Sequence, residues 1–419
     1  MNHKLVTAAL ALGCVFVISQ AFSYPLDGYE RTRIGRLLGY RMALDGKIKS
    51  TIRIPPGGLL GTADVKLRLA GRTDAFEVTE GMQKDAKLQA GLERVFAARD
   101  PSYGIAVLDI TDPAHPRYAA LREYETRIPG SVGKLLVAAG FFDAVRQRYP
   151  EDVEARNRLL RDTIVVADRF VNSDGKTAPY FTPGDQAIVN RRIVIGDRLN
   201  LWEWLDNMFS VSSNAAGSTV WKQAMLLRKF GAGYPPTPEQ EQVFLAATPK
   251  AELGGYARAT LELPLQRSGL NTDRLKLGTF FTSEASKVIP GAASLACPFE
   301  LLRWLVKMEQ GKLVDPWSSL EMKRLMYFTR PRYRYASSPS LSKAAVFFKS
   351  GSLFRCKPEE GFTCKAYAGN VVNLMHSVAV VESAEKVYLV AMMSNILRVN
   401  SAVEHQTVAG EIEKLLQAQ

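Results

Sequence analysis

A serine and a lysine with a spacing suited to covalent catalysis lie at Ser131 and Lys134. Apolar residues follow Lys134 at helical spacing, so we expect a helix to begin here, and residues three apart on a helix face the same side. A neutral lysine amine can accept the serine proton, provided that burial or positive neighbours lower its pKa. The start of the helix also directs free backbone N–H groups at Ser131, where they can bind an oxyanion. The pair therefore indicates acyl transfer through a serine nucleophile.

The same spacing of serine and lysine occurs again at residues 173–176 and 340–343. The first copy, Ser173-Asp174-Gly175-Lys176, lies in a turn-like polar stretch, and the second lies in a loop rich in serine and proline. Only Ser131 follows a Pro-Gly pair and precedes a long amphipathic segment. We therefore interpret Ser131 as the nucleophile and the other two copies as chance occurrences.

Two further polar motifs follow along the chain. Ser212-Ser213-Asn214 comes between two helical patterns, so we place it on a loop. Lys349-Ser350-Gly351 comes at the end of a strand-like run over residues 344–348 and continues into Ser352.

Taken in order, Ser-x-x-Lys, Ser-x-Asn and Lys-Ser-Gly resemble the motif set of the class A β-lactamases and penicillin-binding proteins. The Ile128-Pro129-Gly130 before Ser131, and residues 294–298 opening a helix, are similar to that superfamily as well. The resemblance covers about residues 81–419. It implies an α+β, β-lactamase/transpeptidase-like fold, in which an antiparallel sheet flanked by helices joins an all-helical subdomain and the site lies in the crevice between them.

The resemblance also implies a role for each motif residue. Ser131 would be acylated, with Lys134 as its general base or proton relay. Ser212 would pass the proton to the leaving nitrogen, and Asn214 would bind the acylamino side chain of the substrate.

The third motif would hold the substrate carboxylate and the oxyanion. Lys349 would set the electrostatics of Ser212 and of the carboxylate, to which Ser350 would donate a hydrogen bond. The backbone N–H groups of Ser131 and Ser352 would form the oxyanion hole. Gly351 would let the substrate approach the strand edge, where a side chain would block it.

Two positions depart from the β-lactamase pattern. Ser213 stands where β-lactamases usually have Asp, although the position varies in penicillin-binding proteins. Class A enzymes also need a deacylating Glu, and the closest match here is Glu262, in a segment with a displaced proline. A solvated glutamate in a helix or loop is the alternative for Glu262, and Glu252 is a weaker competitor.

The resemblance leaves three activities open. The first is a serine β-lactamase that hydrolyses the β-lactam amide through an acyl-enzyme. The second is a D-alanyl-D-alanine carboxypeptidase or related peptidoglycan hydrolase, and the third is a slow sensor of β-lactams or wall fragments. The expected partner is a small β-lactam or a D-Ala-D-Ala peptide, with peptidoglycan as a possible polymer.

Other residue types offer weaker candidates. The four histidines, His3, His115, His376 and His405, provide no good Ser-His-Asp arrangement, so we expect structural roles for them. Trp202, Trp204 and Phe209 are expected in the core rather than on the wall of a cleft. No metal-ligand cluster or phosphate-binding glycine loop stands out, so we expect neither metal nor cofactor.

The elements that must position these motifs alternate between helix and strand. We expect a helix over 83–98, strands over 103–110 and 117–121, and helices through the middle of the chain, including 298–308 and 320–327. Strands over 344–349, 371–382 and 386–393 follow, and a helix over 401–416 ends the pattern. Residues 24–80 form an N-terminal extension with short strand-like runs such as 48–54. One sheet is therefore assembled from distant segments.

Residues 1–23 have the pattern of a signal peptide. Lys4 precedes an apolar run over 5–18, and small residues at 21–23 predict cleavage before Tyr24. We therefore expect a periplasmic or secreted protein, with an uncleaved membrane anchor as the alternative. An oxidising compartment favours a disulfide between Cys356 and Cys364 over two free thiols, with Cys297 buried.

Composition sets the outer bounds. The chain has 419 residues, 47% of them hydrophobic and 23% charged, which is typical of a folded protein. The formal net charge of +12 favours anionic partners such as wall polymers, although a solvated basic surface is the simpler interpretation. Because no dense basic run with interleaved aromatic residues occurs, we do not expect a nucleic-acid partner.

Overall fold

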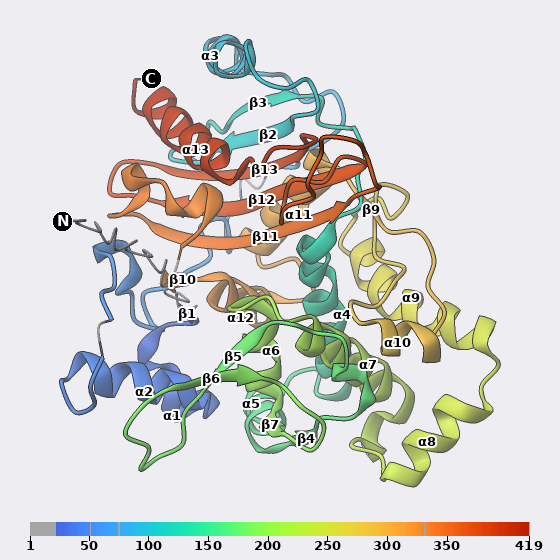
Figure 1. Cartoon of the computed structure of the whole chain (residues 1–419). Helices are drawn as coiled ribbons and strands as arrows, with labels where there is room; N and C mark the ends of the chain where they lie inside the picture. The colour runs from blue at the N-terminus through green and yellow to red at the C-terminus, as the bar shows by residue number, and fades with distance from the viewer. Residues whose placement is uncertain (1–21, 51, 74–75, 331, 419) are drawn as a thin grey trace, which may run out of the picture.

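The computed structural model describes residues 22–50, 52–73, 76–330 and 332–418. Most of the predicted signal peptide, residues 1–21, lies outside this range. A large sheet with helices on both faces lies beside a mainly helical part, and the chain passes between the two more than once (Figure 1).

The main sheet has five antiparallel strands in the order β11-β12-β13-β2-β3. They are β2 (Gly104–Asp109), β3 (Arg117–Leu121), β11 (Ala345–Arg355), β12 (Val372–Glu382) and β13 (Val387–Asn395). The two early strands form one edge of the sheet and the three late strands complete it. The prediction of one sheet built from distant segments is therefore confirmed, as is the α+β class.

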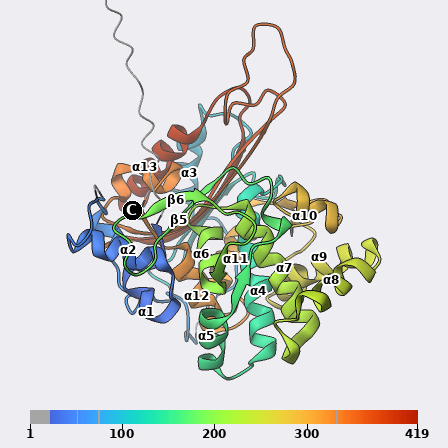
Figure 2. The same ribbon diagram turned by 60° about the horizontal axis from the view of Figure 1, so that its bottom comes forward.

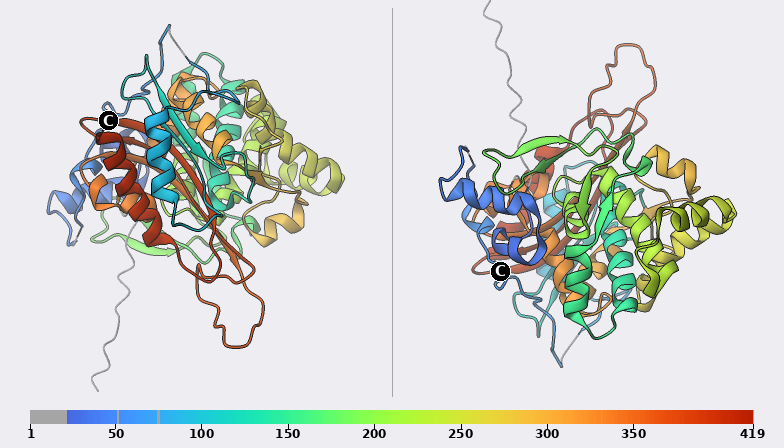
Figure 3. Two further views of the ribbon diagram at one scale, coloured as in Figure 1. Left: turned by 90° about the horizontal axis from the view of Figure 1, so that it is seen from above. Right: turned by 90° about the horizontal axis from the view of Figure 1, so that it is seen from below.

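Helices cover both faces of this sheet. On one face α3 (Ala86–Phe96) packs beside the last helix, α13 (Ala402–Gln417), as Figure 3 shows from above. On the other face lie α11 (Pro298–Glu309) and α12 (Pro316–Met326). Alternate residues of β2 serve the two cores, because Ile105 packs with α3 and α13 whereas Ala106 packs toward the helical part.

The helical part is built around α4 (Lys134–Arg148), whose residues are buried from Lys134 to Val145. Around it lie α5 (Val153–Asp162), α6 (Leu201–Phe209), α7 (Asn214–Phe230), α8 (Pro238–Ala247), α9 (Lys250–Arg267) and α10 (Ser283–Val288). Three two-stranded ribbons connect these helices: β4 (Ile164–Val166) with β7 (Arg198–Asn200), β5 (Thr177–Tyr180) with β6 (Val189–Arg192), and β8 (Leu275–Lys276) with β9 (Leu295–Ala296). Trp202, Trp204 and Phe209 are fully buried, which confirms their assignment to the core.

The N-terminal extension differs from its prediction. Residues 24–50 contain two helices, α1 (Tyr29–Thr32) and α2 (Gly35–Leu44), and the strand expected over 48–54 is wrong for the described residues of that run. The described residues of this run form no strand, and the partly buried side chains of Ile52 and Ile54 pack against the core. In the described chain, strand pairing near the N-terminus is limited to β1 (Phe22–Ser23) with β10 (Phe328–Arg330).

We call residues 24–80 the N-terminal strap, because they contact both parts of the molecule. Arg36 pairs with Asp206 on α6, and both side chains are fully buried. The hydroxyl of Tyr24 donates to Glu321 on α12 over 3.0 Å. Farther along the strap, the backbone N–H of Leu69 donates to the carbonyl of Glu309 at the end of α11. The strap is thus part of the core rather than an appendage.

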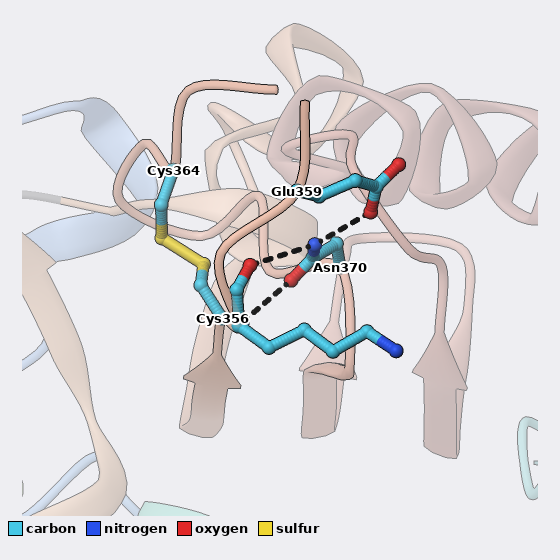
Figure 4. The surroundings of a disulfide bond; sticks show 5 residues. Cys356, Glu359, Cys364 and Asn370 are labelled. Carbon is cyan, nitrogen blue, oxygen red and sulfur yellow. Dashed lines mark hydrogen bonds between the residues drawn. A yellow bond between two sulfur atoms is a disulfide. The ribbon is translucent and has the colours of Figure 1, made fainter. Parts of the chain in front are cut away.

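The loop between β11 and β12 stands out from the body of the molecule (Figures 2 and 3). The predicted disulfide between Cys356 and Cys364 closes it, with 6.2 Å between the Cα atoms, and Cys297 is free and buried. Within the loop the side chain of Asn370 bonds the backbone of Lys357 and the carboxylate of Glu359 (Figure 4). No helix among the described residues is long and apolar enough to span a membrane.

Candidate active site

Ser131 lies on a short 3-10 turn, Gly130–Gly133, that leads directly into α4. The preceding segment is fixed to the rest of the fold: Arg127 and Ala296 exchange backbone hydrogen bonds of 2.8 Å. The Nε2 of the buried His376 on β12 donates to the carbonyl of Ile128 over 2.9 Å. The nucleophile is therefore held between the sheet and the first turn of α4.

Gly351 on β11 packs directly against this turn. A Cβ atom at Gly351 would lie 2.4 Å from the carbonyl oxygen of Pro129 and 3.0 Å from the backbone nitrogen of Val132. From the sequence we expected this glycine to let the substrate approach the strand edge. The structure gives a different reason, since glycine here lets β11 approach the turn that carries Ser131.

Lys134 is fully buried and its Nζ lies among oxygen acceptors. It donates to Ser131 Oγ over 3.0 Å, to the carbonyl oxygen of Ser212 over 2.7 Å and to Asn214 Oδ1 over 2.8 Å. Gly217 on α7 makes room for it, because a Cβ there would lie 2.9 Å from Lys134 Cε. The expected meeting of the serine hydroxyl and the lysine amine thus occurs.

Ser212 joins the second and third motifs. It lies on the loop between α6 and α7, as expected, with a φ of 55°, a left-handed conformation that is uncommon for a serine. Its Oγ accepts a hydrogen bond of 2.8 Å from Lys349 Nζ and one of 3.4 Å from Lys134 Nζ. Ser131, Lys134, Ser212 and Lys349 therefore form one continuous hydrogen-bonded chain.

Ser213, which stands where β-lactamases usually have Asp, caps α7. Its hydroxyl accepts from the backbone N–H of Ala216 over 3.0 Å and donates to Asp174 Oδ2 over 2.7 Å. The same carboxylate oxygen accepts from the N–H of Ala215 over 2.9 Å. A carboxylate from an earlier part of the chain thus lies at the positive end of this helix.

Lys176 is a site residue that the sequence analysis missed. Its Nζ donates to the carbonyl oxygen of Ser212, the same atom that Lys134 binds. Lys176 of the Ser173-x-x-Lys176 copy, which we interpreted as chance, therefore lines the same cavity as Ser131. The available signal was a polar turn between the buried Val171 and the buried Ala178, and nothing in it indicated Ser212 as the partner.

The surroundings of the site lower the pKa of all three lysine amines. Burial, with the charges of Lys176 and Lys349 adding to it, holds the pKa of Lys134 well below that of a free lysine. Burial, followed by the charges of Lys176 and Arg334, likewise lowers the pKa of Lys349. Burial also lowers the pKa of Lys176, to about 8.

A cavity of about 660 Å³ opens over this chain of residues. Its lining includes Ser131, Lys176, Ser212, Arg334, Ser350, Ser352, Tyr367 and Met375. Arg334, a second residue that sequence reasoning missed, donates to the carbonyl of Gly351 over 3.0 Å. Among the described residues, no carboxylate lines this cavity.

The structure does not bring Glu262 to this cluster. Glu262 lies within α9, as Glu252 does, and neither lines the cavity. The ring of Phe281 instead faces Lys134, with its centroid 4.7 Å from Nζ.

The histidines have structural surroundings. His405 is buried on α13, where its Nδ1 lies 3.0 Å from the hydroxyl of Ser377. Burial lowers the pKa of His376 to about 4 and moves that of His405 in the same direction. In the part of the chain that the structure describes, no cluster of three or more His, Cys, Asp or Glu residues could hold a metal ion.

Neither a family profile nor a curated protein sequence matches this chain, but many solved structures do. PBP-A aligns with 80% of this chain and 98% of its own length, at 14% sequence identity and a TM-score of 0.51. A mutant of PBP-A, solved as an acyl-enzyme complex with penicillin G, gives the same coverage and TM-score at 13% identity. This chain has the β-lactamase/transpeptidase fold.

Other solved structures with this fold include a β-lactamase from Sphaerobacter thermophilus, at 13% identity, 80% and 96% coverage and a TM-score of 0.49. The likeness to PBP-A confirms the fold prediction. The cavity over Ser131 lies where β11 meets the 3-10 turn before α4 and the loop between α6 and α7, which is the crevice expected from the sequence.

Proposed function

We propose that the protein is a serine hydrolase that forms a covalent acyl-enzyme at Ser131. The observation that carries this proposal is the hydrogen-bonded chain from Ser131 through Lys134 and Ser212 to Lys349. Such a chain provides a nucleophile, a base within reach of its proton and a path for that proton to a leaving group.

The acylation step follows from these positions. Neutral Lys134 accepts the proton as Ser131 Oγ forms a bond to the carbonyl carbon of the substrate amide. The backbone N–H groups of Ser131 and Ser352 bind the oxyanion of the tetrahedral intermediate. The C–N bond then breaks, and the leaving nitrogen takes a proton from Ser212 Oγ, which Lys134 replaces. The product is an ester at Ser131 and a free amine.

The positive groups on the cavity wall indicate what the substrate carries. Arg334 and Lys176 line the cavity together with Ser350, so a carboxylate beside the scissile amide would be bound there. Lys349 is buried and donates to the carbonyl oxygen of Ser350. The C-terminus of a D-Ala-D-Ala peptide and the carboxylate of a β-lactam both meet this requirement. Asn214 is placed next to Lys134, where it can also bind the acyl side chain.

The second half of the reaction favours one of the three expected activities. Hydrolysis of the ester needs a base for water, and no carboxylate among the described residues lines the cavity. Phe281 contacts Lys134 with an apolar ring instead. Lys134 is neutral again at the end of the acylation step, so it would be the base for this water in place of a carboxylate. We therefore propose a D-alanyl-D-alanine carboxypeptidase or related peptidoglycan hydrolase that releases β-lactams slowly, in preference to the fast β-lactamase that the motifs first suggested.

A paired measurement tests the acyl-enzyme. Intact-protein mass spectrometry after incubation with a penicillin should show one adduct on the native chain and none on Ser131→Ala, with unchanged circular dichroism. Absence of an adduct on the native chain would overturn the proposal.

Turnover assays separate the three activities. Release of D-alanine from an N-acyl-D-Ala-D-Ala peptide, with a long-lived penicillin adduct, supports the peptidase. Rapid turnover of a chromogenic cephalosporin supports the β-lactamase instead, and a stable adduct without turnover of either substrate supports the sensor.

We also propose that the protein works outside the cytoplasm. The disulfide between Cys356 and Cys364 supports this location, because such bonds persist in oxidising compartments. Fractionation of cells expressing the tagged full chain, with the disulfide state read by thiol alkylation, tests it.

A further inference from the structure

Three lysine amines converge on a single residue of the site. Lys134 and Lys176 both donate to the carbonyl oxygen of Ser212, and Lys349 donates to its hydroxyl. The left-handed φ of Ser212 belongs to the loop conformation that places this carbonyl between the first two amines. Because two ammonium groups on one acceptor repel each other, they cannot both be charged at low cost.

The functional motifs account for Lys134 and Lys349 but leave Lys176 without a role. Lys176 directly precedes β5 and lines the cavity. Its Nζ donates to Ser212 on the wall of a cavity whose described lining includes no carboxylate.

We propose that Lys176 is a positioning residue. Its charge, held close to Lys134 by their shared bond to the carbonyl of Ser212, keeps Lys134 deprotonated and able to accept the Ser131 proton. The inference rests on the proposed acylation of Ser131. It explains how the site can present a neutral lysine: proximity to a second amine adds to burial in disfavouring the charged form.

The other groups around Lys134 act in both directions. Lys349 on β11 adds repulsion, whereas Asp174, just before β5, favours the ammonium form. The ring of Phe281 also favours a cation, because it presents its face to Nζ. Ser131, Ser212 and Asn214 supply neutral oxygens, and Arg334 acts on Lys176 rather than on Lys134. The charge of Lys176 thus offsets the effects of Asp174 and Phe281, which both stabilise the ammonium form of Lys134.

The direct test reads the charge of Lys134 in the free protein. The protein is labelled with [ε-13C]lysine, the Lys134 signal is assigned by its loss in Lys134→Met, and its pH titration is followed by NMR. In Lys176→Met the titration midpoint of Lys134 should move to higher pH, and in Lys176→Arg it should stay at or below the native midpoint. An unchanged midpoint in Lys176→Met would overturn the inference whether or not any penicillin reacts.

The functional consequence is read in the acylation rate. For Lys176→Met the second-order rate constant of acylation by a fluorescent penicillin should be about tenfold lower than native at pH 6.5. At pH 9 it should be within about twofold of native, since only the protonated fraction of the base changes. Lys287→Met, which removes an exposed lysine of α10, is the control for net charge and should leave the profile unchanged. An equal loss at every pH in Lys176→Met would indicate a structural or binding role and would contradict the proposal.

The two assays also separate this inference from the proposed function. If the native protein forms no penicillin adduct, the proposed function fails, while the NMR titration still decides the role of Lys176. If the adduct forms but the titration midpoint of Lys134 is the same in the native protein and in Lys176→Met, the proposed function stands and the inference fails.

Discussion

The Nζ of Lys134 lies 4.7 Å from the centre of the Phe281 ring, so an apolar side chain contacts the base of the proposed reaction. Phe281 comes from the loop before α10 and its backbone N–H donates to Ser218 on α7. The ring therefore has a fixed position next to the amine, and among the described residues that line the cavity there is no carboxylate to deprotonate water near an ester at Ser131.

Phe281→Glu should shorten the life of the penicillin adduct, because a carboxylate beside Lys134 can act as a base toward water. General-base assistance is worth about 10²-fold or more, so we expect a decay at least roughly tenfold faster after allowing for imperfect placement. Phe281→Gln is the matched neutral variant. The decay of the adduct is followed by mass spectrometry, and equal lifetimes in the two variants would show that the carboxylate has no effect.

Gly351→Ala should displace the turn that carries Ser131. Its added Cβ would lie 2.4 Å from the carbonyl oxygen of Pro129, so either β11 or the turn must shift. We expect a loss of about 1–3 kcal/mol in the free energy of unfolding and at least about a tenfold slower acylation. Gly233→Ala, at a site with no atom within 4 Å of the new Cβ, should change neither urea unfolding nor labelling.

The stability of the protein should rise with pH above about 8. Burial lowers the pKa of Lys176 to about 8 in the folded protein, whereas it is near 10.4 in the unfolded chain. Between these values the unfolded chain binds the extra proton, so raising the pH favours the folded state, and below pH 8 the penalty is constant. The free energy of urea unfolding should rise by on the order of 1 kcal/mol from pH 7.5 to 9.5.

Lys176→Met should flatten this rise, because it removes one of the groups responsible. Lys134 and Lys349 contribute with the same sign, since burial lowers the pKa of each. A native curve that falls between pH 7.5 and 9.5 would contradict the burial of charged amines at the site.

Arg36→Leu should destabilise the protein strongly. Arg36 and Asp206 are both buried, and removing the guanidinium leaves a carboxylate in the core without its partner. The expected cost is about 3–5 kcal/mol, measured by urea unfolding. Arg41→Ala breaks an exposed ion pair with Asp45 on the same helix and should cost under about 0.5 kcal/mol. A comparable loss in the two variants would mean that burial of the pair is unimportant.

Glu262→Gln should leave both acylation and turnover unchanged, because Glu262 lies within α9 away from the cavity lining. Stopped-flow labelling and cephalosporin turnover check this. Accumulation of an acyl-enzyme in this variant would instead assign deacylation to Glu262.

The sequence could predict the parts of the site that local patterns record. Ser131 and Lys134 are three residues apart, and the apolar face that follows them predicts the helix that brings them together. The alternation and runs of the late strands likewise predict β12 and β13 within two residues, whereas β11 extends to Arg355, six residues beyond the predicted end. The order of the motifs supplied the rest through their resemblance to a known superfamily.

What the sequence could not predict depends on contacts between distant segments. Lys176 binds a backbone carbonyl 36 residues later in the chain. Every residue has such a carbonyl, so the sequence does not indicate which one a lysine binds. The need for glycine at position 351 arises from the carbonyl of Pro129, which no spacing reveals. The strap was misjudged because Ile52 and Ile54 alternate with polar residues like a strand, although they pack on the core and form no strand.

The N-terminal strap sets an order of events during synthesis. Its ion pairs join residues far apart in the chain: Arg36 with Asp206, 170 positions later, and Arg68 with Glu382, 314 positions later. During synthesis the strap therefore emerges before the sheet and the helical part, but Arg68 can pair with Glu382 only after β12 has been made. Long loop closures of this kind slow folding, so the strap is made early and is among the last segments to dock. Until Asp206 has been made, the buried Arg36 stays in water, and the active-site loop that follows Asp206 lacks its support.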